Sequence, residues 1–322
     1  MATLKYVIKR ILLMIFIFFA IMVICFVMIK SLPNPVTSTG AQAQIEEARR
    51  EALGYNKPIM EQLGIYIKNV FTDWNWGVSW RIDYMANASD VVTDRIVPTL
   101  LINIYSLLFS VPIGILFGVL AALKKNKWQD QVISTGVMLF ISVPSFVYAF
   151  LVQYIFAFKA GWLPAIASSL SDAGGSYLSP IMTKSLILPV LSLSFGTIAG
   201  LTRSTRAELT EALTSDYMLL ARTKGLTKGQ AIFRHALKNA MVPILPGIIS
   251  SFVGILSGSF IIEQIFAVPG VGSLYIKSIQ LMDYDVFVFV TAFYTFIGLA
   301  ANILIDLSYG FLDPRVRMGS RK

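Results

Sequence analysis

Long apolar runs alternate with charged segments along the whole chain. The first run, from Ile11 to Ile29, holds 19 residues without a charge, and about 20 apolar residues are enough to cross a bilayer as a helix. Pro189 interrupts the fourth run, which membrane helices tolerate when neighbours satisfy the freed backbone groups. The pattern predicts an all-α polytopic membrane protein with six transmembrane helices, at Ile11–Ile29, Pro98–Leu123, Val132–Phe158, Leu186–Leu201, Ile248–Ala267 and Val286–Phe311.

Composition and charge agree with this class of protein. Apolar residues make up 56% of the chain and the mean hydropathy is +0.69, against roughly 45–50% apolar residues in soluble globular chains. The formal net charge is +9. With the N-terminus inside, the inner segments hold 17 Lys and Arg, while the two short outer loops hold only Lys159, Lys184 and Lys277. We therefore expect a cell-membrane protein that contacts the lipid bilayer, has both termini in the cytoplasm and binds no nucleic acid.

The N-terminus resembles a secretory signal, because Lys9 and Arg10 precede the first apolar run. That run is longer than the usual apolar region of about 7–15 residues, so we expect an uncleaved first helix at 1–30. The single cysteine, Cys25, lies inside the run and supports neither a disulfide framework nor a metal site.

The segment 31–97 is expected to form an extracytoplasmic insertion after the first helix. Six basic and eight acidic residues give it a net charge of −2. It contains a helix-like stretch, Gln42 to Leu53, and the aromatic cluster Trp74, Trp76 and Trp80, a residue type that favours the membrane–water interface. Two interpretations stand open: a docking surface or vestibule wall, and a structural cover.

Small residues four apart recur in three of the apolar runs, at Gly114 and Gly118, Gly196 and Gly200, and Gly254 and Gly258. This spacing lets helix backbones approach closely, so it predicts packing within or between subunits; the alternative is that the glycines line a moving pathway.

Carboxylates are rare within the apolar runs. Glu263 and Asp306 are the only ones, and both lie near the ends of their runs. Glu263 either faces an aqueous pathway or gate, or pairs at a helix end. A proton-coupled carrier would be expected to place a carboxylate or His at mid-membrane, which this pattern does not offer.

A basic, polar segment separates the fourth and fifth runs. Asp216–Leu226 and Lys228–Met241 are predicted as two short helices, with Gly225 and Gly229 near the break. Such helices form either an amphipathic knob that enters a partner's cleft or a basic surface helix on lipid headgroups. The predicted apolar underside is Leu219, Leu220, Leu226, Ile232 and Phe233, and the polar heads are Arg222, Lys224, Lys228, Arg234 and Lys238.

The chain carries no catalytic motif that we can identify. It lacks the G-x-x-x-x-G-K-[ST] sequence that cradles nucleotide phosphates. His235 is the only histidine and is interpreted as a polar contact in the loop. No nucleophile–base pair or metal cluster is evident, which disfavours a membrane enzyme.

The central segment resembles the coupling loop of binding-protein-dependent ABC import permeases. Leu219-Leu220-Ala221 and Gly225 align with that family's Glu-Ala-Ala and Gly pattern, from which the first two residues depart. The departure is usual in the dipeptide/oligopeptide/nickel branch, and the long loop after the first helix resembles its B-type subunit. Further similar motifs are Pro58 and Gln62, Trp76–Ser79, Pro98–Leu100, Pro144 and Phe146, Gly161–Pro164, Glu263–Phe266, Pro269–Gly272, Asp283-Tyr284 and Leu312–Arg317.

The resemblance implies a type I ABC importer permease fold and a non-catalytic role. It implies a second homologous permease, two cytoplasmic ABC ATPases that bind ATP and Mg, and an extracytoplasmic substrate-binding protein; this chain itself would hold no cofactor and no metal. The expected core is 98–312, including a coupling loop at 204–245, with a cytoplasmic tail at 313–322. The residues implied for ATPase coupling are Asp216, Tyr217, Ala221, Arg222, Lys224, Gly225, Arg234, His235 and Asn239.

The implied cargo is a peptide, either an oligopeptide or a dipeptide. Nickel or another small solute is the alternative within the same family. A secondary carrier or channel, which would need no ATPases, is the alternative from a different class.

Overall fold

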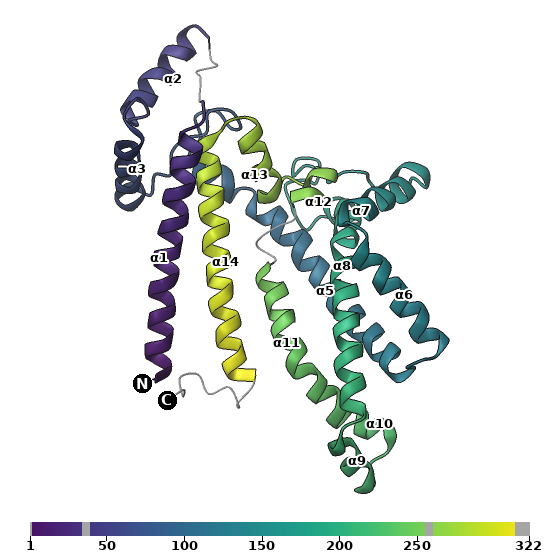
Figure 1. Cartoon of the computed structure of the whole chain (residues 1–322). Coiled ribbons are helices and arrows are strands. Elements are labelled where there is room, and N and C mark those ends of the chain that lie inside the picture. The colour runs from purple at the N-terminus through teal and green to yellow at the C-terminus, as the bar shows by residue number, and fades with distance from the viewer. Residues whose placement is uncertain (1, 34–38, 255–259, 313–322) are drawn as a thin grey trace. The chain divides into compact units, whose positions relative to one another are not determined.

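The computed structural model describes residues 2–33, 39–254 and 260–312, and helices dominate these ranges (Figure 1). Within them the only extended pairing is an isolated bridge between Val78 and Asn87. The helices are α1 (Ala2–Lys30), α2 (Ala41–Ala52), α3 (Ile59–Asp73), α4 (Ala88–Thr93), α5 (Ile96–Leu123), α6 (Trp128–Ser142), α7 (Ser145–Gln153), η1 (Tyr154–Lys159, a π-helix), α8 (Pro180–Leu213), α9 (Asp216–Thr223), α10 (Lys228–Ala231), η2 (Ile232–Ala236, a π-helix), α11 (Leu237–Gly254), α12 (Phe260–Ile265), α13 (Val271–Gln280) and α14 (Tyr284–Leu312).

Within the described ranges, four helical segments are long and apolar enough to cross a membrane: Ile8–Lys30, Ala88–Leu123, Pro180–Leu213 and Tyr284–Ile303. A bent helix pair raises this number to five. The predicted fifth span, Ile248–Ala267, includes residues 255–259, which lie outside the described ranges. The expected count of six therefore stays a prediction.

The predicted third span, Val132–Phe158, is wrong as a single helix. α6 ends at Ser142, α7 begins at Ser145, and the two directions differ by 104°. Pro144 lies at the break and has no amide hydrogen to continue the α6 ladder, and Val143 before it is extended, as a residue preceding proline prefers. Hydropathy alone does not register this change of direction.

Pro189 does not interrupt α8. The helix runs unbroken for 34 residues, beginning with Pro180 in its first turn and continuing 12 residues beyond the predicted end at Leu201. Ser179 caps its N-terminus by accepting a hydrogen bond from the Met182 amide at 3.2 Å. The predicted coupling loop at 204–245 therefore begins as the last turns of a membrane helix.

The chain divides into two compact units. The first comprises residues 1–97 and 269–300, and its core joins α1, α4, α13 and the first half of α14 through side chains such as Phe26, Val92, Val271 and Val288. The second comprises, among the described residues, 98–254, 260–268 and 301–312. It has one apolar core around α7, α8 and α12, and another around the end of α8 and the helices that follow.

Close helix packing in the second unit centres on two of the predicted glycines. A Cβ built on Gly114 would lie 2.7 Å from the Leu201 Cβ, and one built on Gly118 would overlap Thr205 and lie 2.9 Å from the Thr202 carbonyl oxygen. The Thr202 hydroxyl also donates to the Gly114 carbonyl oxygen at 3.1 Å. α5 and α8 therefore approach each other at a distance that no larger residue at these two positions permits.

The other predicted glycine pairs do not show the same close helix packing. A Cβ on Gly196 would sit 3.5 Å from the Tyr148 hydroxyl, whereas one on Gly200 would meet nothing within 4 Å. Gly254 is the last residue of α11, and Gly258 lies outside the described residues.

Candidate functional site

The segment between α8 and α11 folds into a compact helical knob, which we define as residues 215–240. One face of α9 points inward, where Met218 and Ala221 are buried. Ala231 and Ala236 from the following helices are buried against them, together with Leu209 of α8. Because alanines dominate this cluster, the short helices pack tightly on the end of α8, and their outer faces are held in a fixed orientation.

The turn within the knob depends on Gly225. Its φ of +86° lies in the left-handed region that glycine adopts without a Cβ clash. The amide of Leu226 donates to the Ala221 carbonyl oxygen at 3.3 Å, closing the end of α9 in the manner of a glycine C-cap. Thr227 and Gln230 then form a capping box that starts α10.

The outer face of the knob exposes large apolar side chains, and here one prediction is wrong. Leu219 is 67% exposed and Phe233 is 70% exposed, and Leu220 is exposed as well. They were expected on the underside, where Ile232 is buried and Leu226 is partly buried. In α9 the inward positions are three apart, 218 and 221, which directs residues 219 and 220 away from the cluster.

The residues implied for coupling lie on this outer surface, with one exception. Asp216, Tyr217, Arg222, Lys224, Gly225, Arg234, His235 and Asn239 are all exposed, whereas the Ala221 side chain is buried. The Arg222 guanidinium donates to the Leu226 carbonyl oxygen at 3.3 Å and so braces the turn. Ala221 therefore contributes to the knob's own packing and offers no side chain to a partner.

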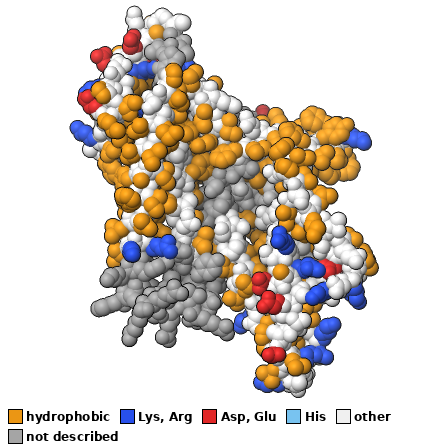
Figure 2. Space-filling model, in the orientation of Figure 1, with side chains coloured by type: hydrophobic (Ala, Val, Ile, Leu, Met, Phe, Trp, Pro, Cys, Tyr) orange, Lys and Arg blue, Asp and Glu red, His pale blue; other side chains and the backbone are white. Residues whose placement is uncertain are grey.

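A groove of about 630 Å³ opens beside α9. Its walls come from the ends of α5 and α8, including Leu123 and Leu213, and from Leu219, Arg222 and Lys228 of the knob. Figure 2 shows Lys and Arg side chains gathered over the end of this unit where α9 and α10 lie, with apolar side chains at the tip. The surface combines exposed apolar anchors with a basic rim, which suits a protein cleft lined by acidic and apolar groups.

An ion pair beside the knob ties α6 to α8. The Arg206 guanidinium donates twice to the Asp130 carboxylate, at 2.5 and 2.8 Å, and Asp130 is buried. The amide of Asn126 adds a bond of 2.9 Å and the Ser134 hydroxyl one of 3.2 Å. The sequence analysis did not single out this pair, since Asp130 follows a run of lysines and gives no periodic signal.

Glu263 lies on α12 and is fully buried. The Thr99 hydroxyl of α5 donates to the Glu263 carboxylate at 3.0 Å. The backbone carbonyl oxygen of Glu263 accepts a hydrogen bond from the Val268 amide at 2.8 Å. The side chain is thus held among helix ends of the second unit, and its role at a pathway or gate stays a prediction.

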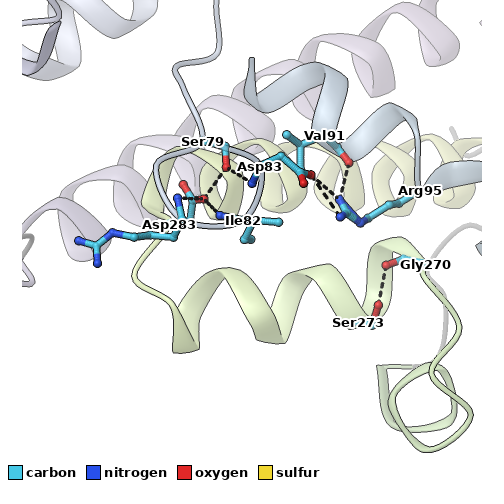
Figure 3. Close-up of polar contacts among 9 residues, drawn as sticks. Ser79, Ile82, Asp83, Val91, Arg95, Gly270, Ser273 and Asp283 are labelled. Atoms are coloured by element: carbon cyan, nitrogen blue, oxygen red, sulfur yellow. Dashed lines mark hydrogen bonds and ion pairs between the residues drawn. The ribbon is translucent and has the colours of Figure 1, made fainter. Parts of the chain in front are cut away.

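In the first unit, two motifs distant in sequence meet at buried carboxylates. Figure 3 shows the Ser79 hydroxyl and the Ile82 amide directed at Asp283, with bonds of 2.6 and 3.0 Å. The amides of Trp80 and Arg81 complete the set, at 3.2 and 3.1 Å. Asp283 is fully buried, and these four donors stabilise its carboxylate.

A second carboxylate, Asp285, lies two residues further along. The Lys30 ammonium at the end of α1 donates to it at 2.7 Å, and the Val78 amide does so at 3.1 Å; the Tyr55 hydroxyl also donates. Gly77, with φ +93°, passes so close that a Cβ there would overlap this carboxylate. The Trp76–Ser79 and Asp283-Tyr284 motifs are therefore parts of one anchor that fixes the 74–87 loop.

Comparison with known proteins gives the family. Residues 114–318 match the binding-protein-dependent transport system inner membrane component, and residues 3–107 match the N-terminal part of such membrane components. The chain is 31% identical to the glutathione transport system permease protein GsiC of Escherichia coli (strain K12), over 98% of this chain and 99% of that protein. The GsiC protein of Shigella dysenteriae serotype 1 (strain Sd197) gives the same values.

Among solved structures, the fold is similar to the inward-facing MetNI methionine ABC transporter. The TM-score is 0.51 at 16% identity, over 68% of this chain and 96% of that one. This supports the expected type I permease architecture. The chain therefore belongs to the family of binding-protein-dependent transport system inner membrane components, and it is a non-catalytic, multi-pass permease subunit of an ABC importer.

Proposed function

We propose that the knob at 215–240 is the coupling element of this permease and seats in a groove of a cytoplasmic ATPase. The observation that carries the proposal is the pair of large apolar side chains, Leu219 and Phe233, held outward by a buried alanine cluster. A solvated loop gains nothing from exposing them, whereas a desolvated interface uses such side chains as anchors. The basic rim from Arg222, Lys224 and Arg234 would steer the knob toward an acidic groove.

The rest of the assembly follows from this role. A second homologous permease completes the translocation pathway, two ATPases bind ATP and Mg, and a binding protein delivers substrate outside. In this arrangement the protein resides in the inner membrane with both termini in the cytoplasm, and the 31–97 insertion faces outward. The 98–312 core with its 204–245 loop is the moving half of the pathway, and ATP shifts its equilibrium because ATP binds the closed ATPase pair better.

We propose a short peptide as the cargo. Full-length similarity to permeases named for glutathione, itself a tripeptide, supports this class above nickel or another small solute. Uptake of labelled glutathione and of a labelled tripeptide by cells expressing the complete importer distinguishes the classes, with nickel uptake as the competing outcome.

Leu219→Asp tests the coupling proposal. Burying a leucine side chain stabilises an interface by about 1.5–3 kcal/mol, so a carboxylate there should weaken ATPase binding by roughly 10–100-fold. The measurement is the amount of ATPase that co-purifies with the tagged permease, together with uptake by whole cells.

Leu178→Asp is the matched control. Leu178 is 71% exposed and precedes α8, whereas Leu219 follows that helix. Each variant therefore replaces an exposed leucine by aspartate, at opposite ends of the same helix. We expect normal membrane levels for both variants and loss of the ATPases only for Leu219→Asp. Equal retention of the ATPases by the two variants contradicts the proposal.

A further inference from the structure

An apolar groove of about 430 Å³ runs along α1 in the first unit. Its walls are the side chains of α1, α3 and α14 together with the tryptophans that follow α3. Phe19 of α1 stacks on Phe71 of α3 with ring centroids 5.9 Å apart, and Phe26 meets Tyr66 at 4.9 Å, so α3 lies against the later half of α1. Nearly every side chain that lines the groove is aliphatic or aromatic, including Met14, Val70, Phe296 and Leu299.

α3 has a wider apolar face than its contact with α1 requires. At about 100° per residue, Leu63, Tyr66 and Val70 fall on one side of this face, and they pack on the core of the first unit. Met60, Ile67 and Phe71 fall on the neighbouring side and are exposed. Polar residues, among them Glu61 and Lys68, occupy the opposite side. The helix is therefore amphipathic, and half of its apolar arc stays largely exposed.

The surroundings of α1 indicate what contacts the exposed apolar face of α3 and the groove beside it. Ile8–Lys30 is one of the candidate membrane spans, and only 11% of its most apolar stretch is buried within the protein. Figure 2 shows apolar side chains gathered over the region of α1 and α3. The open side of the groove is thus continuous with a helix surface that faces the bilayer.

We propose that this groove holds one acyl chain of a bilayer phospholipid, on the side of the membrane next to the 31–97 segment. The α1 residues that line it run from Met14 to Phe26, which at 1.5 Å per residue is about 18 Å. One leaflet of the hydrocarbon core is about 15 Å thick, so the groove, which continues past Phe19 at the middle of the Ile8–Lys30 span, is long enough for a single chain. α3 then lies in the leaflet alongside α1, and the bound chain packs against both helices. The inference needs α1 to span the bilayer and is independent of ATPase coupling.

The first test counts phospholipids retained by the complete importer, extracted in mild detergent, using native mass spectrometry. Ile67→Trp fills the groove from α3, and Met60→Trp is the matched control, because Met60 lies on the same helix but outside the lining. We expect one tightly held phospholipid per copy in the wild type and in Met60→Trp, and none in Ile67→Trp. Equal retention in all three proteins, or a mass that corresponds to a lipoprotein anchor or a polypeptide, overturns the proposal.

The second test does not depend on how Ile67→Trp folds. The importer is reconstituted into vesicles of phosphatidylglycerol whose chains are brominated at carbons 6 and 7, and the Trp74 signal is the difference between wild type and Trp74→Phe. Heavy-atom quenching requires contact, so we expect the Trp74 signal to be lower in brominated than in unbrominated vesicles. An unchanged signal shows that Trp74 does not contact lipid and overturns the assignment.

Discussion

Replacing Asp283 by alanine should release the 74–87 loop in the first unit. The carboxylate accepts four hydrogen bonds, from the Ser79 hydroxyl and the amides of residues 80–82, and it is fully buried. Hydrogen bonds to a charged group contribute about 1.5–3 kcal/mol each but do not add fully. Removing one partner of a buried charged network costs about 3–5 kcal/mol, since the remaining groups stay buried without bonds. We take this range as the loss in local opening free energy.

Hydrogen exchange at the amides of residues 80–82 measures that loss directly. Because 1.4 kcal/mol corresponds to a factor of ten, Asp283→Ala should speed exchange at these amides by at least about 10²-fold. Asp94→Ala is the control, as Asp94 is an exposed carboxylate after α4 in the same segment. Unchanged protection at residues 80–82 in Asp283→Ala would refute the anchor, because those amides bond to the carboxylate itself.

Two further predictions concern the second unit, and thermal unfolding of the detergent-solubilised protein measures both. Gly118→Val should lower stability by about 1–3 kcal/mol, since any Cβ meets Thr205, whereas Gly136→Val should have little effect because nothing lies within 4 Å of that position. Equal effects would contradict the close α5–α8 approach. Asp130→Ala should cost about 1.5–3 kcal/mol through the lost bonds from Arg206, and an unchanged melting temperature would show that the pair is not maintained in solution.

The sequence predicted the end of α5 and both ends of α2 to within one residue. The run Pro98–Leu123 ends at the same residue as α5, and Gln42–Leu53 differs from α2 by one residue at each end. At Leu123 the change from apolar to polar residues coincides with the last hydrogen-bonded turn, whereas α2 is a polar helix that ends just before Gly54. α3 and α13 were not expected as helices, because their polar faces dilute the hydropathy signal on which the spans were based.

Direction and orientation within elements were harder to predict. The bend at Pro144 leaves the apolar content of the run unchanged, so composition could not locate it. The outward position of Leu219 depends on how the alanines of later helices pack under α9, which is a tertiary constraint. The Asp130–Arg206 pair and the Asp283 anchor each join residues more than 70 positions apart, beyond the reach of any local pattern.

The most direct test of the central claim is photo-crosslinking from the tip of the knob in the intact importer. A benzophenone amino acid replaces Phe233, and the same probe at Leu178 serves as the control. We predict that the Phe233 probe joins the permease to a subunit that carries the nucleotide-binding G-x-x-x-x-G-K-[ST] motif, and that the Leu178 probe does not. Crosslinks from Phe233 to phospholipid alone, or to the extracytoplasmic binding protein, would contradict the assignment of residues 215–240 as the coupling element.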